Sequence, residues 1–198
     1  MATFAHTLLQ AAVGNAPASD LLTQAATSTS SLSATSGIAY ANASSTLLSY
    51  PARLSIPAIG IDAAIQKVGL TAKGAIASPT NFTDAGWYKF STLPGKQGSA
   101  ILDGHVDNGL GLSGIFKHLS DVQKGEDIYV TTGNGTKLDF VVTSVDSYDY
   151  QHVPLETIMQ LDDSARISLI TCEGSWVSDQ RTYNERLVVS AVLRNTGY

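Results

Sequence analysis

The sequence predicts a mainly β protein, in which residues 51–198 fold into a closed or nearly closed barrel of seven or eight short strands with two short helices. Three observations lead to this prediction. From Arg53 onward, short apolar stretches alternate with polar residues and end at frequent turn signals. The chain of 198 residues is 43% hydrophobic, so it can bury a substantial core. Closing the sheet into a barrel removes exposed strand edges.

Residues 1–50 differ in composition and are predicted to be an N-terminal appendage that is partly spacer and partly helical. They contain 28 Ala, Ser or Thr residues, no Lys or Arg, and one acidic residue, Asp20. Such a composition is typical of a flexible spacer. Two stretches with end signals, at 7–13 and 21–26, are nevertheless expected to be short helices whose apolar stripes need a surface to pack against.

The expected elements of the barrel domain follow from local pattern. Strands are predicted at residues 52–56, 59–68, 99–106, 126–132, 137–148, 165–172 and 185–194. A hairpin turn is expected at Gly133-Asn134-Gly135, because Asn-Gly tolerates the positive φ angles of such turns. Helices are expected at 113–119, which carries apolar residues on one face, and at 154–161, which begins with a proline.

Charge and cysteine content exclude several classes of protein. The net charge of −5 and the absence of a Lys/Arg cluster argue against a nucleic-acid surface, so peptides or proteins are the expected partners. A single cysteine excludes a disulfide within the chain. No run approaches the roughly 20 apolar residues that cross a bilayer, and residues 1–10 lack the basic start of a signal peptide.

Cys172, the only cysteine, ends the apolar run Leu169-Ile170-Thr171-Cys172 and is a candidate nucleophile. A reactive thiol needs an accessible edge and a nearby cation that stabilises the thiolate. His105 follows an apolar strand and a glycine, and Arg186 lies in the next apolar stretch. A thiolate, an imidazole and a guanidinium can attack a carbonyl, protonate a leaving amine and stabilise an oxyanion. We therefore predict that these three residues meet at the ends of three strands.

Several short motifs together resemble those of the sortases, the cysteine transpeptidases of the bacterial surface. They occur in the family's order across residues 52–194, and the chain looks nearest to the class D-, E- and F-like groups. The motifs are Arg53–Ile61, Gly86-Trp87-Tyr88, Pro94-Gly95, Gly104-His105, Leu169–Cys172 and Arg186–Val189.

The resemblance implies a role for each matching residue. Cys172 would attack the Thr–Gly bond of an LPxTG-like sorting signal to form a thioester, and an amine of the cell wall or of a pilin would then resolve it. His105 would act as general acid and then base, and Arg186 would orient the substrate or stabilise the oxyanion. Thr171, Glu173 and Trp176 would support the oxyanion site or the substrate. No cofactor and no metal are expected.

The resemblance also implies a location outside the cell membrane, with a membrane anchor that is not part of this chain. The expected partners are the sorting-signal peptide and the amine acceptor, without nucleic acid. We further hypothesise that the N-terminal appendage folds back and partly covers the cleft at Cys172, since its apolar stripes need a neighbouring surface.

Asp103 departs from the family's pattern, because small residues commonly precede its Gly-His pair. On a strand, positions 103, 105 and 107 share one side, so Asp103 and Asp107 are hypothesised to flank His105, favour its imidazolium and raise the pH optimum. Alternatively, both acids are solvated at the strand end. Asp103, His105 and Asp107 could also hold a metal in a metal-dependent hydrolase. A non-catalytic barrel that binds cell-wall peptide is a further alternative.

Overall fold

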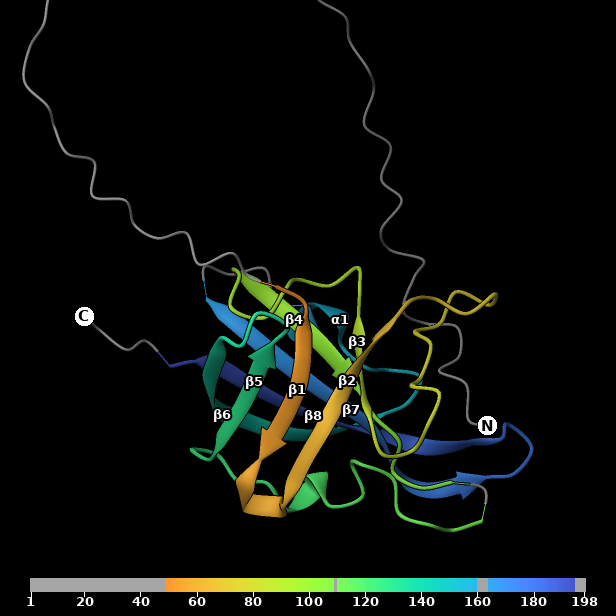
Figure 1. Cartoon of the computed structure of the whole chain (residues 1–198). Coiled ribbons are helices and arrows are strands. Elements are labelled where there is room, and N and C mark those ends of the chain that lie inside the picture. The colour runs from red at the N-terminus through yellow and green to blue at the C-terminus, as the bar shows by residue number, and fades with distance from the viewer. Residues whose placement is uncertain (1–48, 109, 160–163, 195–198) are drawn as a thin grey trace, which may run out of the picture.

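The computed structural model describes residues 49–108, 110–159 and 164–194 and shows a closed eight-stranded β-barrel with almost no helix (Figure 1), which confirms the predicted fold class. Around the barrel the strands follow the order β1-β2-β3-β4-β7-β8-β6-β5. Their bounds are β1 Pro51–Ile56, β2 Ile61–Val68, β3 Ala85–Tyr88, β4 Gly98–Asp103, β5 Asp127–Thr132, β6 Lys137–Asp149, β7 Ala165–Val177 and β8 Thr182–Leu193.

Strand β4 lies at the centre of the wall that carries the candidate site. It runs parallel to β7, whereas β3 on its other side is antiparallel. All six of its residues are buried, because Ala100 and Leu102 face the barrel core while Ile101 faces a second apolar cluster outside it. Strands covered on both faces read as continuous apolar runs, as this one does.

The second apolar cluster, here called the outer cluster, covers the outside of β4, β7 and β8. It contains Ile101 of β4, Ile170 of β7 and Val188 of β8. The single-turn helix α1, Leu155–Ile158, adds the fully buried Ile158 to it, and the carbonyl of Ile158 accepts a hydrogen bond of 3.0 Å from the Ser168 hydroxyl. The three strands therefore each present an apolar residue to the same outer face.

Alternation along these strands places the candidate residues on that outer face. Asp103 lies two positions after Ile101 on β4, and Cys172 lies two positions after Ile170 on β7. On β8, Arg186 lies two positions before Val188. Side chains two apart on a strand point to the same side. The site is thus an extension of the outer cluster and does not belong to the barrel interior.

Two strands at the site are longer than the sequence predicted. Strand β7 continues five residues past Cys172, and β8 begins at Thr182, so Trp176 lies in a strand and not in the predicted loop. Gly174, which reads as a loop signal, instead occupies a bulge with φ +81°. The three candidate residues accordingly do not meet at strand ends, because Cys172 and Arg186 sit within a continuous hairpin.

The helix predicted over 113–119 is wrong. The segment forms turns followed by a 3-10 helix at Leu119–Asp121, because its backbone groups bond to other segments. The N–H of Gly114 donates to the carbonyl of Val106 at 2.9 Å, and that of Phe116 donates to His105 at 3.0 Å. The helix predicted over 154–161 is present only as the four-residue α1, Leu155–Ile158, because Met159 already lies in a bend; residues 160 and 161 lie outside the described residues.

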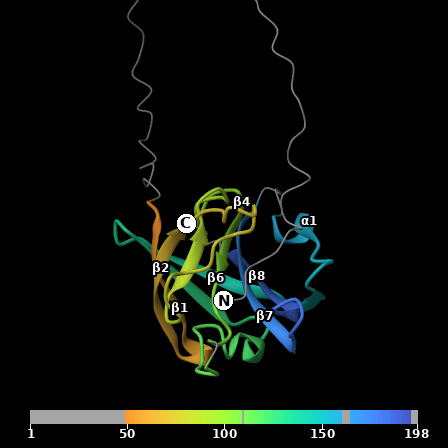
Figure 2. The same ribbon diagram turned by 90° about the vertical axis from the view of Figure 1, so that its right-hand side faces the viewer.

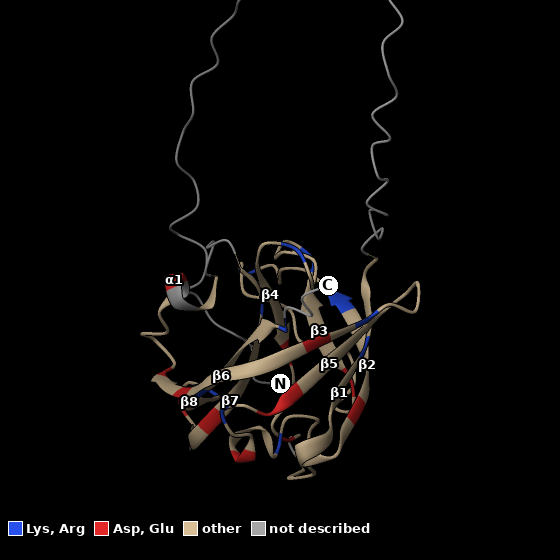
Figure 3. Ribbon diagram, turned by 90° about the vertical axis from the view of Figure 1, so that its left-hand side faces the viewer, with Lys and Arg blue, Asp and Glu red and all other residues tan. Residues whose placement is uncertain are grey.

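The helices expected at 7–13 and 21–26, and the hypothesis that residues 1–50 cover the cleft, lie outside the described residues. The hairpin turn at Gly133-Asn134-Gly135 is confirmed, with Gly135 at φ +85°. Within the described ranges, no helix has the length and apolarity to cross a membrane. Along the described ribbon, acidic and basic residues are interspersed (Figure 3).

Candidate active site

A cavity of about 980 Å³ lies against the outer face of β7 and holds both Cys172 and His105 in its lining. Three segments surround it: the segment after β4, the β7–β8 hairpin and the loop before β3. These segments lie at the same end of the molecule, on the right of Figure 1 and toward the viewer in Figure 2. The cavity thus brings together residues that are far apart in the chain.

Cys172 and Arg186 are direct partners across the antiparallel β7–β8 pair. Arg186 is only 3% exposed, and Nη1 donates hydrogen bonds to the carbonyls of Tyr183, at 2.9 Å, and Glu185, at 2.7 Å. Nη2 donates to the Thr182 hydroxyl at 2.8 Å. These bonds hold the guanidinium in one orientation beside the sulfur, which a freely rotating side chain would not achieve.

Opposing effects act on Cys172, and the pKa of its thiol is raised overall because burial has the largest influence. Burial raises the pKa of the Cys172 thiol, and the carboxylate of Asp107, together with that of Asp103 where it is ionised, also raises it. The guanidinium of Arg186 acts in the opposite direction and lowers it. Burial in turn lowers the pKa of Arg186. A cation placed beside a desolvated thiol is the arrangement that makes a thiolate accessible in a largely apolar environment.

His105 is held by the loop before β3. Its Nε2 donates to the carbonyl of Pro79 at 3.3 Å, and its ring packs against Phe82 with 4.8 Å between centroids. Because a carbonyl only accepts, Nε2 carries the proton, which leaves Nδ1 of the neutral ring as the nitrogen that can take one up. Gly114 makes the close approach possible, since a Cβ there would lie 2.1 Å from the His105 carbonyl oxygen.

The three residues predicted to support the substrate have different positions. Thr171 is fully buried, and its hydroxyl donates to the carbonyl of Gly104 at 2.8 Å, so it ties the cysteine strand to the residue before the histidine. Glu173 accepts a hydrogen bond from Ser147 and does not line the cavity. Trp176 does line it and is 47% exposed.

Asp103 is neither solvated nor a source of full negative charge near neutral pH. It is 2% exposed, and neither carboxylate oxygen has a hydrogen bond of normal geometry among the described residues. Burial raises the pKa of Asp103 to about 8, and the nearby Ser78 hydroxyl offsets only part of this rise. Gly86 provides the space, since a Cβ there would lie 2.5 Å from an Asp103 oxygen. The hypothesis of an acidic pair that favours the imidazolium therefore fails at Asp103.

Asp107 lines the cavity and accepts a hydrogen bond from the hydroxyl of Tyr183. Tyr183 was not a sequence candidate, although it also lines the cavity and packs edge to face on Trp176, with 5.4 Å between centroids. The hydrogen bond from Tyr183 links the segment after β4 to the β7–β8 hairpin, in addition to the bond between Thr171 and Gly104.

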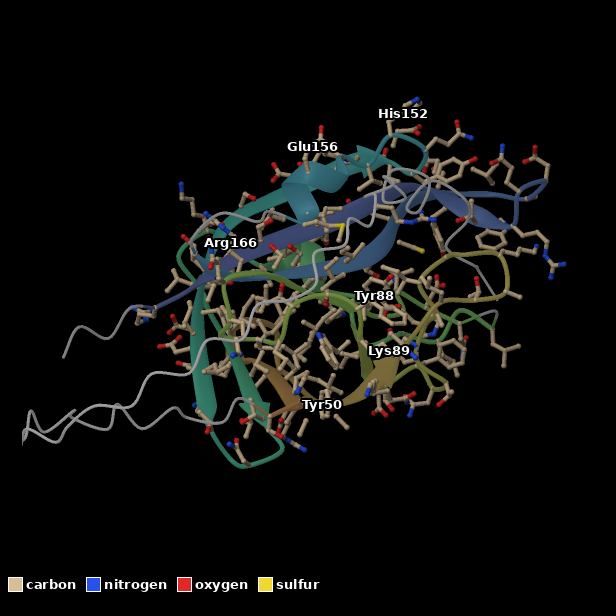
Figure 4. All side chains as sticks on the ribbon, turned by 90° about the horizontal axis from the view of Figure 1, so that it is seen from above. Tyr50, Tyr88, Lys89, His152, Glu156 and Arg166 are labelled. Atoms are coloured by element: carbon tan, nitrogen blue, oxygen red, sulfur yellow. The ribbon has the colours of Figure 1, made fainter. Side chains whose placement is uncertain are left out.

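Among the described residues, no group of three His, Cys, Asp or Glu side chains is placed to hold a metal ion. The metal-site alternative at Asp103, His105 and Asp107 therefore lacks the geometry it requires. His152 lies in the loop before α1, where its ring forms a hydrogen bond of 3.1 Å with Asp149, and it points away from the barrel (Figure 4).

The structure is thus a closed β-barrel in which Cys172 and His105 line one cavity and the buried Arg186 pairs with Cys172 across β7 and β8, an arrangement that suits thiol chemistry. A family model described as Sortase domain matches residues 54–194. The chain belongs to the sortase family and is, in that general sense, a cysteine transpeptidase. No significant match is found among curated proteins.

Solved sortase structures share the fold at low sequence identity. Sortase C-1 from Actinomyces oris is 21% identical, with a TM-score of 0.59 over 73% of this chain and 74% of that one. Sortase A from Listeria monocytogenes is 19% identical, with a TM-score of 0.54 over 73% and 86%. Sortase D5 from Clostridium perfringens is 18% identical, with a TM-score of 0.55 over 74% and 79%. The TM-scores are similar for sortases A, C and D, so they do not distinguish between sortase classes. The resemblance to the class D-, E- and F-like groups stays a prediction.

Proposed function

We propose that Cys172 is the nucleophile of a transpeptidase that cleaves an LPxTG-like sorting signal between Thr and Gly. The observation that carries the proposal is the direct pairing of Cys172 with the buried Arg186 across β7 and β8, with His105 lining the same cavity. His105 is the general acid and base. Arg186 stabilises the thiolate and the oxyanion through its charge.

The reaction has two halves in this proposal. The Cys172 sulfur attacks the threonine carbonyl carbon, the C–N bond to glycine breaks, and the thiol proton passes through His105 to the leaving amine. An acceptor amine then attacks the thioester, the C–S bond breaks, and the sulfur recovers a proton. Thr171 holds Gly104, and so helps to keep the His105 segment beside the cysteine strand.

The proposed substrates follow from the family. The donor is the sorting signal of a surface protein, and the acceptor is an amine of a cell-wall peptide or a pilin. We place the enzyme on the outer face of the bacterial cell membrane. The apolar lining at Pro79, Phe82 and Trp176 supports an extended peptide with apolar residues as the donor.

A peptide-library transpeptidation assay tests the proposal. The full chain is incubated with candidate sorting peptides and an amine, and mass spectrometry identifies the cleaved bond, the acyl-enzyme on Cys172 and the transferred product. Cys172→Ala is expected to lose both acyl-enzyme and product. Turnover by Cys172→Ala at the wild-type rate would overturn the proposal.

Two treatments separate the remaining alternatives. Thiol alkylation is expected to abolish turnover, whereas a chelator is expected to have no effect. The opposite pattern would favour the metal-dependent hydrolase, despite the placement of Asp103. Peptide binding that survives in Cys172→Ala, with no acyl-enzyme in the wild type, would indicate a non-catalytic barrel.

A further inference from the structure

We propose that Asp107, held by Tyr183, forms the subsite that binds the ammonium group of the amine acceptor and so sets specificity for charged primary amines. The inference rests on the proposed function, since it concerns the second half of that reaction. It adds a binding residue on the acceptor side, where the family resemblance assigned none.

The position of Asp107 is the first argument. Among the described residues that line the cavity, Asp107 is the sole carboxylate, and the lining contains no Lys or Arg. Its charge raises the pKa of Cys172, so it acts on the sulfur through space. A single anion in a cavity with apolar walls attracts a cation more strongly than it would in water.

Tyr183 keeps the carboxylate in place. Its hydroxyl donates to Asp107, and this bond raises the pKa of Tyr183 to about 12, so the phenol stays protonated and remains a donor. The Tyr183 ring packs against Trp176, which restricts its rotation. An ionised carboxylate accepts at about four positions and the phenol uses one, so capacity remains for an ammonium group.

The cost of Asp107 to the first half of the reaction is the second argument. A negative charge near Cys172 opposes formation of the thiolate that must attack the donor peptide. A neutral side chain would avoid this cost. In the second half the enzyme carries a neutral thioester, and the same charge then favours an incoming ammonium. The charge therefore suits the acceptor step.

The proton balance of that step is complete without another reagent. The bound ammonium gives one proton to neutral His105, and its nitrogen attacks the thioester carbonyl carbon. As the C–S bond breaks, the second proton passes to the Cys172 sulfur and the amide keeps the third. The imidazolium of His105 returns its proton to water.

The test compares two acceptors with the full chain at pH 7, using a sorting peptide as donor. Triglycine has an amine that is mostly charged at this pH, whereas hydroxylamine is neutral. Asp107→Asn is expected to raise the KM for triglycine about tenfold or more, because a charge-assisted hydrogen bond is lost. Tyr183→Phe is expected to raise it by less. The KM for hydroxylamine stays within about twofold.

A separate measurement, the rate of thioester formation, distinguishes a loss of acceptor binding from a loss of the active-site structure. Thioester formation by Asp107→Asn is expected to be as fast as in the wild type or faster, because the pKa of Cys172 falls when the carboxylate is removed. Asp121→Asn, a change at an exposed residue paired with His118, is the matched control and leaves all three measurements unchanged.

Three results would overturn the inference. These are an unchanged KM for triglycine, an equal loss with triglycine and hydroxylamine, and a rise in the KM for the sorting peptide alone, which would place a cation on the donor. If the wild type forms no thioester at all, the proposed function itself fails, and this outcome is distinguishable from the other three.

Discussion

Replacing Asp103 by Asn is expected to stabilise the protein increasingly as the pH rises. The carboxyl is 2% exposed, lacks a hydrogen bond of normal geometry among the described residues, and has a folded-state pKa raised to about 8 from 3.8. A group with a raised folded-state pKa binds protons more tightly in the folded state. The contribution of the protonated Asp103 carboxyl to the free energy of unfolding is complete below pH 3.8 and is lost progressively as the pH rises toward 8.

The size of the effect follows from the two pKa values. Keeping a carboxyl protonated above its unfolded pKa costs about 1.36 kcal/mol for each pH unit. Between pH 4 and pH 7 the free energy of unfolding of Asp103→Asn is therefore expected to gain about 4 kcal/mol relative to the wild type. Asn has nearly the same shape, so the packing against Gly86 is retained.

Urea unfolding of both proteins at a series of pH values measures this difference. Any constant offset from the buried amide cancels, because the slope of the difference with pH carries the information. Asp121→Asn is the control, since that residue is exposed and its difference curve should be flat. A flat curve for Asp103→Asn between pH 4 and pH 8 would refute the reasoning.

Three further predictions concern the residues that hold the site together. Arg186→Lys loses the fixed hydrogen-bonding geometry and should lower kcat about 100-fold while thermal unfolding remains cooperative; a loss under threefold would contradict the proposed role. Thr171→Val leaves the Gly104 carbonyl without its donor and should cost about 1–3 kcal/mol in urea unfolding, whereas Thr171→Ser should cost less; equal costs would count against the bond. Gly114→Ala should displace the His105 backbone and lower both activity and stability, unlike Gly133→Ala; similar effects of the two would speak against this contact.

Local pattern was sufficient for most of the barrel. Strand alternation, the Asn-Gly hairpin and the apolar run into Cys172 are properties of short segments, and the structure follows them. The helix expected over 113–119 failed because its N–H groups bond to His105, Val106 and Phe82, which are distant or outside the segment. Periodicity cannot reveal such competition. Strand β3 was missed because four residues with a central glycine give little pattern.

The residues of the candidate site likewise divide into those that the sequence could identify and those that it could not. His105, Cys172 and Arg186 could be selected because their residue types and flanking apolar runs suit thiol chemistry. Tyr183 could not be selected, because a tyrosine in a strand is usually a packing residue and only its hydrogen bond to Asp107 marks it.

The sequence by itself determined seven of the eight strands, the alternation that places Cys172 and Arg186 on one face, and the chemical groups available there. Tertiary structure alone decided that Asp103 is buried without a normal hydrogen bond, that Asp107 meets Tyr183, and that Thr171 ties the two strands together. The physical reason is distance along the chain. Burial, charge coupling and hydrogen bonds in this site join residues as much as 76 positions apart, and only the pairing of β4 with β7 and of β7 with β8 brings them within reach.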